Sequence, residues 1–127
     1  MYNDRVVKEF SNPQNVGEMK DANAVGTVGN ATCGDIMKIF MKINENDVIE
    51  DVSFQTFGCA AAIATSSVAT TMIKGKTVEE ALKITNKQVV DELGGLPAQK
   101  LHCSVLAEEA IKEAVNNYLT EYKNKKN

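Results

Sequence analysis

The clearest pattern in the chain is an alternation of apolar and charged residues between positions 37 and 43. Apolar side chains occupy Met37, Ile39, Met41 and Ile43, and lysines occupy positions 38 and 42 between them. A period of two indicates a strand with one buried face. The polar run 44–47 predicts a turn, and residues 48–57 resume as a second strand with Val52 and Phe54 on one face. Together the two segments predict an antiparallel hairpin.

Helical signals dominate the second half of the chain. The expected helices cover residues 60–74, 77–83, 86–93 and about 104–122. Gly75 suits the C-terminal end of the first, and Thr77 with Glu80 forms the capping box that opens the second. The last helix carries one apolar stripe, formed by Ala107, Ala110, Ile111, Ala114, Val115, Tyr118 and Tyr122.

The first third of the chain is less regular. Residues 3–10 predict a short helix that ends before Pro13, because the residue preceding proline avoids helical angles. Within the Gly-, Asn- and Ala-rich stretch 14–34, Val25 and Val28 are the best strand candidates. Strands therefore come first and helices later. This order predicts an α+β fold: a small antiparallel sheet of about three strands, packed against C-terminal helices in a single domain over residues 1–127.

Composition narrows the function classes. The chain has 127 residues, 43% of them hydrophobic, which is enough for a core that does not require a metal to fold. A net charge of −3 without a basic stripe argues against nucleic-acid binding. We also expect no membrane span and no secretory signal, because no apolar stretch is long enough for either. Three cysteines, an odd number, favour reduced thiols and a cytoplasmic location.

The candidate chemistry lies in three short segments that are far apart in the sequence. They supply five residues that can bind metal: Cys33, Asp35, Cys59, His102 and Cys103. Gly34 leaves room for its two neighbours to point at one site. Two of the thiols fall at predicted helix starts, where unpaired backbone N–H groups favour the thiolate. If the segments converge, they form a shallow open site for a metal or a cluster.

These residues alone leave several interpretations open. The chain has no Cys-x-x-Cys pair, and unpaired cysteine is often simply a buried core residue. Three cysteines with one histidine or aspartate would also suit tetrahedral zinc. A third alternative is an enzyme with Cys103 as nucleophile and His102 as base. Adjacent residues at a helix start rarely face each other, and no group to orient the histidine is evident.

The same segments resemble those of a known family. The matching stretches are Phe10–Gly17, Val28–Gly29, Cys33–Lys38, Phe57–Cys59 and Lys100–Glu108. They are similar to the iron–sulfur cluster assembly scaffold family, which comprises IscU and the N-terminal domain of NifU, over nearly the whole chain. The resemblance implies that the five candidate residues are cluster ligands or their exchange partners. It implies a non-enzymatic scaffold that holds a transient [2Fe–2S] cluster, with iron as precursor. The ligand chemistry also suits zinc in the cluster-free form.

The resemblance also implies partners. A cysteine desulfurase would deliver persulfide sulfur to a thiol, most plausibly Cys103 on a mobile loop, and a ferredoxin-like donor would reduce it. Apo iron–sulfur proteins would receive the cluster, and whether a homodimer shares it stays open. Carboxylate is a weaker partner for this iron than thiolate, so Asp35 is expected to keep the cluster labile.

Two comparisons within the family refine this expectation. The SufU type carries an insertion before its third cysteine and lacks the neighbouring histidine, whereas this chain has His102 and no evident insertion. The IscU and NifU branch therefore fits better. The family's Hsp70-type chaperone motif reads Leu-Pro-Pro-Val-Lys, but residues 96–100 read Leu-Pro-Ala-Gln-Lys here. The loss of a proline and a valine weakens the expectation of chaperone recognition.

Overall fold

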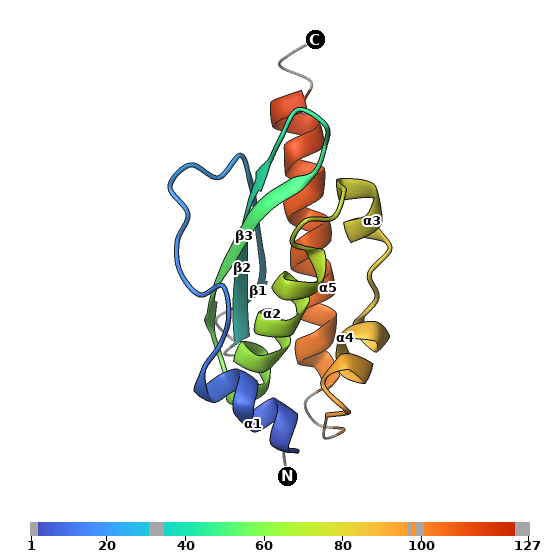
Figure 1. Ribbon diagram of the computed structural model, residues 1–127. Coiled ribbons are helices and arrows are strands. Elements are labelled where there is room, and N and C mark those ends of the chain that lie inside the picture. Colours follow the sequence, from blue (N-terminus) through green and yellow to red (C-terminus); the bar gives the residue numbers. More distant parts are fainter. Residues whose placement is uncertain (1–2, 31–34, 97, 99–100, 124–127) are drawn as a thin grey trace.

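Figure 1 shows the computed structural model, which describes residues 3–30, 35–96, 98 and 101–123. In chain order its elements are α1 (Asp4–Ser11), β1 (Ala24–Asn30), β2 (Asp35–Ile43), β3 (Ile49–Phe57), α2 (Ala60–Ile73), α3 (Val78–Leu82), α4 (Asn86–Glu92), α5 (Leu101–Asn117) and the π-helical segment η2 (Tyr118–Lys123). Within the described residues, no helix is both long and apolar enough to span a membrane.

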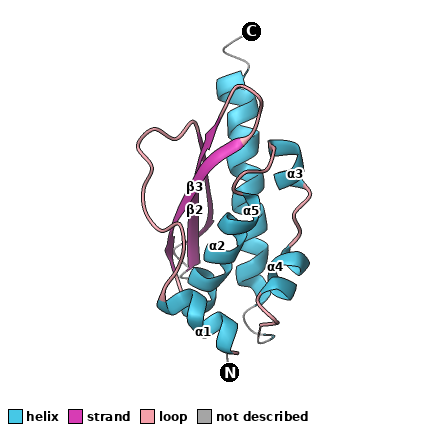
Figure 2. Cartoon of the chain, viewed as in Figure 1, coloured by secondary structure: helices cyan, strands magenta, loops and turns pink. Residues whose placement is uncertain are grey.

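The sheet has three antiparallel strands in the order β1-β2-β3. The two long helices cover one face of it: α5 packs on β1 and β2, and α2 packs on β3 (Figures 1 and 2). The outer edge of β3 is paired in part by the segment before β1, because Phe54 accepts a hydrogen bond from Gly17 N and donates one to Asn15 O, each at 2.9 Å. The predicted α+β class is confirmed.

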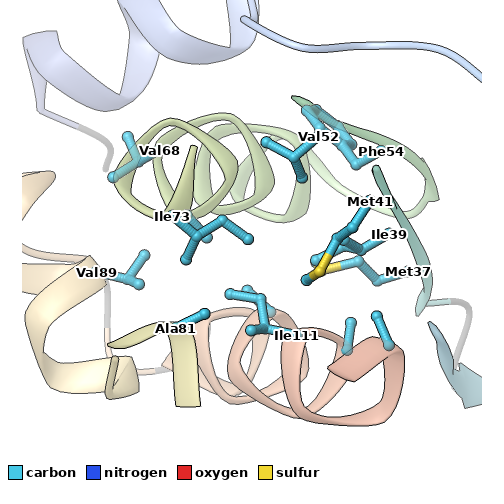
Figure 3. Packing of buried hydrophobic residues seen from close by; sticks show 14 of the residues in the cluster. Met37, Ile39, Met41, Val52, Phe54, Val68, Ile73, Ala81, Val89 and Ile111 are labelled. Carbon is cyan, nitrogen blue, oxygen red and sulfur yellow. The ribbon is translucent and has the colours of Figure 1, made fainter. Parts of the chain in front are cut away.

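The alternation in β2 builds the core. Met37, Ile39, Met41 and Ile43 all face the helices and are buried. Figure 3 shows Met37, Ile39 and Met41 on the side of the sheet that faces Ile73 of α2 and Ile111 of α5. Each such side chain contributes about 1.5–3 kcal/mol by leaving water. Phe40 is buried on the opposite face, which the alternation did not predict, and the ammonium group of Lys38 lies 5.2 Å from the centre of its ring.

Close contact between β1 and α5 depends on a glycine. Gly26 faces α5, and a Cβ at this position would lie only 2.4 Å from the backbone nitrogen of Ala114 and 2.6 Å from the carbonyl oxygen of Ala110. Because these are backbone atoms, a rotamer change could not relieve the overlap. The missing side chain sets how near the helix comes to the sheet.

The N-terminal helix α1 is attached to both α2 and the end of α4. Asn3 caps α1 by accepting a hydrogen bond from Val6 N at 2.9 Å, and its amide donates to Leu93 O at 3.0 Å and to Gly95 O at 3.2 Å. Glu9 is nearly buried and accepts a 2.7 Å hydrogen bond from Ser67 of α2. The helix therefore closes one end of the molecule (Figure 1).

The short helices begin as expected. Thr77 and Glu80 form a reciprocal capping box at α3, and Thr85 and Gln88 form a second one at α4. Each box satisfies two backbone N–H groups that a helix start would otherwise leave unpaired.

Candidate functional site

The candidate site lies at the sheet end where β2 begins and β3 ends. Ile36 pairs with Phe57, and Asp35, the first residue of β2, pairs with Asn30 of β1. The hydroxyl of Thr56 donates a 2.7 Å hydrogen bond to Ile36 O and fastens β3 to β2 at this end. Cys59 follows two residues after Phe57, so the sheet brings it beside the start of β2.

Cys59 is the N-cap residue of α2. Its backbone is extended, with φ −84° and ψ 174°, and its carbonyl accepts hydrogen bonds from Ala62 N at 3.0 Å and Ile63 N at 3.3 Å. The side chain makes no capping hydrogen bond. Its sulfur instead lies 3.7 Å from the sulfur of Cys103. The predicted meeting of these two cysteines is thus observed.

The position of Cys103 corrects two expectations. The last helix begins at Leu101 and not near residue 104, so Cys103 lies in the first turn of α5 and not on a mobile loop. Ser104 lies inside the helix, and its hydroxyl donates a 2.6 Å hydrogen bond back to Leu101 O. Cys103 is 0% exposed, whereas Cys59 is partly exposed. At this pair, one cysteine is therefore buried and the other is partly open to solvent.

The spacing of the two sulfurs has a direct meaning for metal chemistry. Thiolates bind zinc at about 2.3 Å, and two ligands at that distance from a tetrahedral metal lie about 3.8 Å apart. The observed Sγ–Sγ distance of 3.7 Å matches this spacing. One metal ion could therefore bind both sulfurs with little rearrangement of either helix.

The other three candidate residues are not joined to this pair by the structure. Cys33 lies outside the described residues, as do the side chains of Asp35 and His102, although the backbones of these two belong to β2 and α5. Among the residues whose side chains are described, no group of three or more His, Cys, Asp or Glu is placed to hold a metal. The five-residue ligand set stays a prediction.

Two exposed apolar side chains flank the cysteine pair. Phe57, two residues before Cys59, is 75% exposed, and Leu101, two residues before Cys103, is 42% exposed. Sequence reasoning treated Phe57 only as part of a motif and gave Thr56 no role. A strand position alone does not reveal that one hydroxyl ties the strands together or that an aromatic ring faces water.

Among the described groups with a resolved pKa shift, one pair lies at the other end of β2. A 2.8 Å ion pair with Lys42 lowers the pKa of Asp21 and raises that of Lys42. Lys42 lies six residues along β2 from Ile36, a distance of about 20 Å in a strand. This ion pair is therefore remote from the cysteines.

Comparisons with known proteins agree with this architecture. The family model described as "NifU-like N terminal domain" matches residues 1–126. The iron-sulfur cluster assembly scaffold protein IscU 1 of Archaeoglobus fulgidus is 61% identical over 118 residues, which cover 93% of this chain and 76% of the relative. The scaffold protein IscU of Aquifex aeolicus is 54% identical over 119 residues, with coverage of 93% and 76%.

A solved structure extends the comparison to the fold. The N-terminal part of a nitrogen-fixing NifU-like protein from Brucella abortus superimposes with a TM-score of 0.71 and covers 94% of each chain, at 20% identity. Because the family model matches residues 1–126 and the two relatives are 54–61% identical, the chain belongs to the NifU-like N-terminal domain family, and the predicted resemblance is confirmed. The two relatives are named as scaffold proteins and not as enzymes, as expected for this family.

Proposed function

We propose that this protein is a scaffold on which a transient [2Fe–2S] cluster is assembled and from which it passes to apo-proteins. The observation that carries the proposal is the 3.7 Å separation of the Cys59 and Cys103 sulfurs, which suits two ligands of one tetrahedral metal. The family relationship supports the same function, because relatives 54–61% identical are named iron–sulfur cluster assembly scaffolds. In this function the cluster is cargo and not a resident cofactor.

The proposed ligand set adds Cys33 to this pair, with Asp35 or His102 as the fourth ligand. A [2Fe–2S] cluster that is held permanently commonly has four cysteine ligands, whereas this chain has only three. Carboxylate is a harder ligand than thiolate and suits this iron less well. Asp35 is the first residue of β2, and its neighbour Ile36 pairs with Phe57 at the end of β3. The backbone of Asp35 therefore lies at the same end of the sheet as the cysteine pair, which supports its inclusion in the ligand set. A weak fourth ligand allows the cluster to leave.

Assembly also needs sulfur and electrons. A cysteine desulfurase is proposed as the source of persulfide sulfur, and a ferredoxin-like donor supplies the two electrons that reduce each persulfide to thiolate and sulfide. Because Cys103 is buried and Cys59 is partly exposed, delivery to Cys103 requires the first turn of α5 to open. Apo iron–sulfur proteins are the proposed acceptors, and the cytoplasm is the proposed location.

One further partner question does not touch the described residues. The chaperone motif region contains Pro97, Gln99 and Lys100, all outside the described part of the chain. Its weakened chaperone recognition therefore stays a prediction from the sequence.

Anaerobic reconstitution with ferrous iron and sulfide tests the proposal. We expect visible absorbance from a bound cluster and equal amounts of iron and acid-labile sulfide in the desalted protein. Cys59→Ser and Cys103→Ser should each lose most of this absorbance while retaining the far-ultraviolet circular dichroism of the wild type. A folded wild-type protein that binds iron without sulfide would contradict the scaffold function.

Zinc binding is the second candidate, because the same sulfur spacing suits tetrahedral zinc equally well. The reconstitution experiment separates the two. A colourless protein that retains one zinc per chain after treatment with iron and sulfide would favour a zinc protein. Displacement of zinc by a coloured cluster would favour the scaffold.

The role of Asp35 has a specific test. Asp35→Ala should bind the cluster but release it to an apo-ferredoxin about tenfold more slowly, because the labile ligand is gone. Asp51→Ala is the matched control, since Asp51 pairs with Lys42 at the far end of the same strand pair. Transfer by Asp35→Ala at the wild-type rate would contradict this role.

A further inference from the structure

Besides binding one metal, the sulfurs of Cys59 and Cys103 are close enough to form a disulfide bond after a small movement. A disulfide bond has an S–S length of about 2.05 Å, so the Cys59 and Cys103 sulfurs need to approach by only about 1.7 Å to form one. At 3.7 Å the two sulfurs are not bonded to each other. We propose that Cys59 and Cys103 form an oxidation site, in which a small-molecule disulfide converts this thiol pair to an intramolecular disulfide when no metal is bound.

The unequal exposure of the two cysteines sets the order of the steps. Cys59, at the junction of β3 and α2, is partly exposed, whereas Cys103 is 0% exposed. A reagent as large as oxidised glutathione therefore reaches Cys59 first. Cys103 then lies within 3.7 Å of the modified sulfur and acts as the resolving thiol.

The chemistry balances without a metal. The Cys59 thiolate attacks one sulfur of oxidised glutathione, which forms a mixed disulfide and releases one glutathione thiolate. The Cys103 thiolate then attacks the Cys59 sulfur, which forms the intramolecular disulfide and releases the second glutathione. Two protein thiols are oxidised by loss of two electrons and two protons, and one oxidised glutathione is reduced to two thiols.

The consequence for activity rests on the proposed function. A disulfide removes two of the three thiolates that a cluster needs, so the oxidised protein cannot begin assembly. Thiol reductants reverse the bond, which makes the site a reversible block. A metal held by both sulfurs occupies their lone pairs and prevents the oxidation.

The decisive experiment uses metal-free full-length protein and contains no iron. Cys33→Ser protein is incubated with oxidised glutathione under anaerobic conditions, quenched with iodoacetamide and weighed by mass spectrometry. We expect a loss of about 2 Da, no alkylation of the two remaining cysteines, and full reversal by dithiothreitol. Proteolysis should yield a linked peptide pair containing Cys59 and Cys103. Bound Zn²⁺ should slow the reaction at least tenfold.

A variant identifies the order of attack. In the Cys33→Ser background, Cys103→Ser should accumulate a stable glutathione adduct on Cys59, because the resolving thiol is missing. Cys103→Ala, which places no hydroxyl in the buried position, repeats the test if the serine variant does not fold.

Three outcomes would overturn the proposal. The first is a stable glutathione adduct on Cys59 in folded Cys33→Ser protein, and the second is no reaction at all. The third is wild-type protein whose main disulfide includes Cys33. Failure of the scaffold function would show itself differently, as reduced wild-type protein that assembles no cluster. The two failures are therefore distinguishable.

Discussion

At the scale of single residues, Gly26 determines how closely α5 lies on the sheet. In Gly26→Ala the new Cβ would meet backbone atoms of Ala114 and Ala110 at less than 3 Å. We expect a loss of about 3 kcal/mol in the free energy of unfolding, at the upper end of the usual cost of overpacking. Urea denaturation measures it. The neighbouring Thr27→Ala, at an exposed position, should cost less than about 1 kcal/mol. Equal losses in both variants would contradict this role for Gly26.

The two described cysteines should differ in reactivity. In metal-free Cys33→Ser protein, we expect Cys59 to react with iodoacetamide at least about tenfold faster than Cys103, because Cys103 needs a local opening that costs about 1.4 kcal/mol or more. Pulsed alkylation with peptide mass spectrometry measures both rates. In urea-unfolded protein the two rates should become similar, which serves as the control. A faster reaction at Cys103 in the folded protein would restore the mobile-loop expectation.

The candidate ligands could be identified from the sequence, but their surroundings in the folded protein could not. The type and number of candidate ligands follow from the letters alone, and Cys59 and Cys103 do meet. The sequence left open whether Cys103 is buried, because its burial depends on α5 beginning at Leu101 and on packing by distant elements. The side chains of Asp35 and His102 lie outside the described ones, so their part in the site stays a prediction.

At the scale of elements, the two capping boxes form a natural pair that differs in charge. Glu80 at α3 accepts hydrogen bonds from the backbone and side chain of Thr77, which hold the pKa of Glu80 below its ordinary value of 4.5. Gln88 plays the same part at α4 and does not titrate. Only the α3 box should therefore depend on pH.

The direction of that dependence follows from the lowered pKa. The stabilisation from ionised Glu80 is fully present above its unfolded-state pKa and is lost as pH falls through the lower folded-state pKa. Wild type should thus lose stability relative to Glu80→Gln as pH falls from about 7 to about 3. The difference in urea midpoints between the two proteins measures this. Gln88→Glu should create a similar dependence at α4, and a wild-type advantage that grows in acid would contradict the assignment.

Element types were predictable where a local signal was strong. The alternation in β2 and the Thr77 capping box each identified an element within a few residues of its observed bounds. The start of α5 was placed too late, because no capping residue in the sequence marks Leu101 as a helix start. The burial of Phe40 was also missed: the ammonium group of Lys38 lies over its ring, and a period of two cannot show such a contact.

At the scale of the whole molecule, the cysteine pair connects the two long helices. Cys59 lies between the end of β3 and the start of α2, while Cys103 belongs to the first turn of α5, which packs on β1 and β2. The fold class followed from the order of strands and helices. That order alone does not show that Cys59 and Cys103, 44 positions apart, lie together, because their contact depends on the packing of α2 beside α5.

Metal bound across this pair should therefore stabilise the whole fold. With free Zn²⁺ at about 100 times its dissociation constant, we expect the free energy of unfolding to rise by about 2.7 kcal/mol, because the metal binds the native state preferentially. Differential scanning fluorimetry should show a rise of several degrees in Tm, reversed by EDTA. The control is the double variant Cys59→Ser/Cys103→Ser, compared with its own metal-free Tm so that any cost of the substitutions cancels. An equal rise in the double variant would mean that zinc binds elsewhere, and the sulfur pair would then not be a metal site.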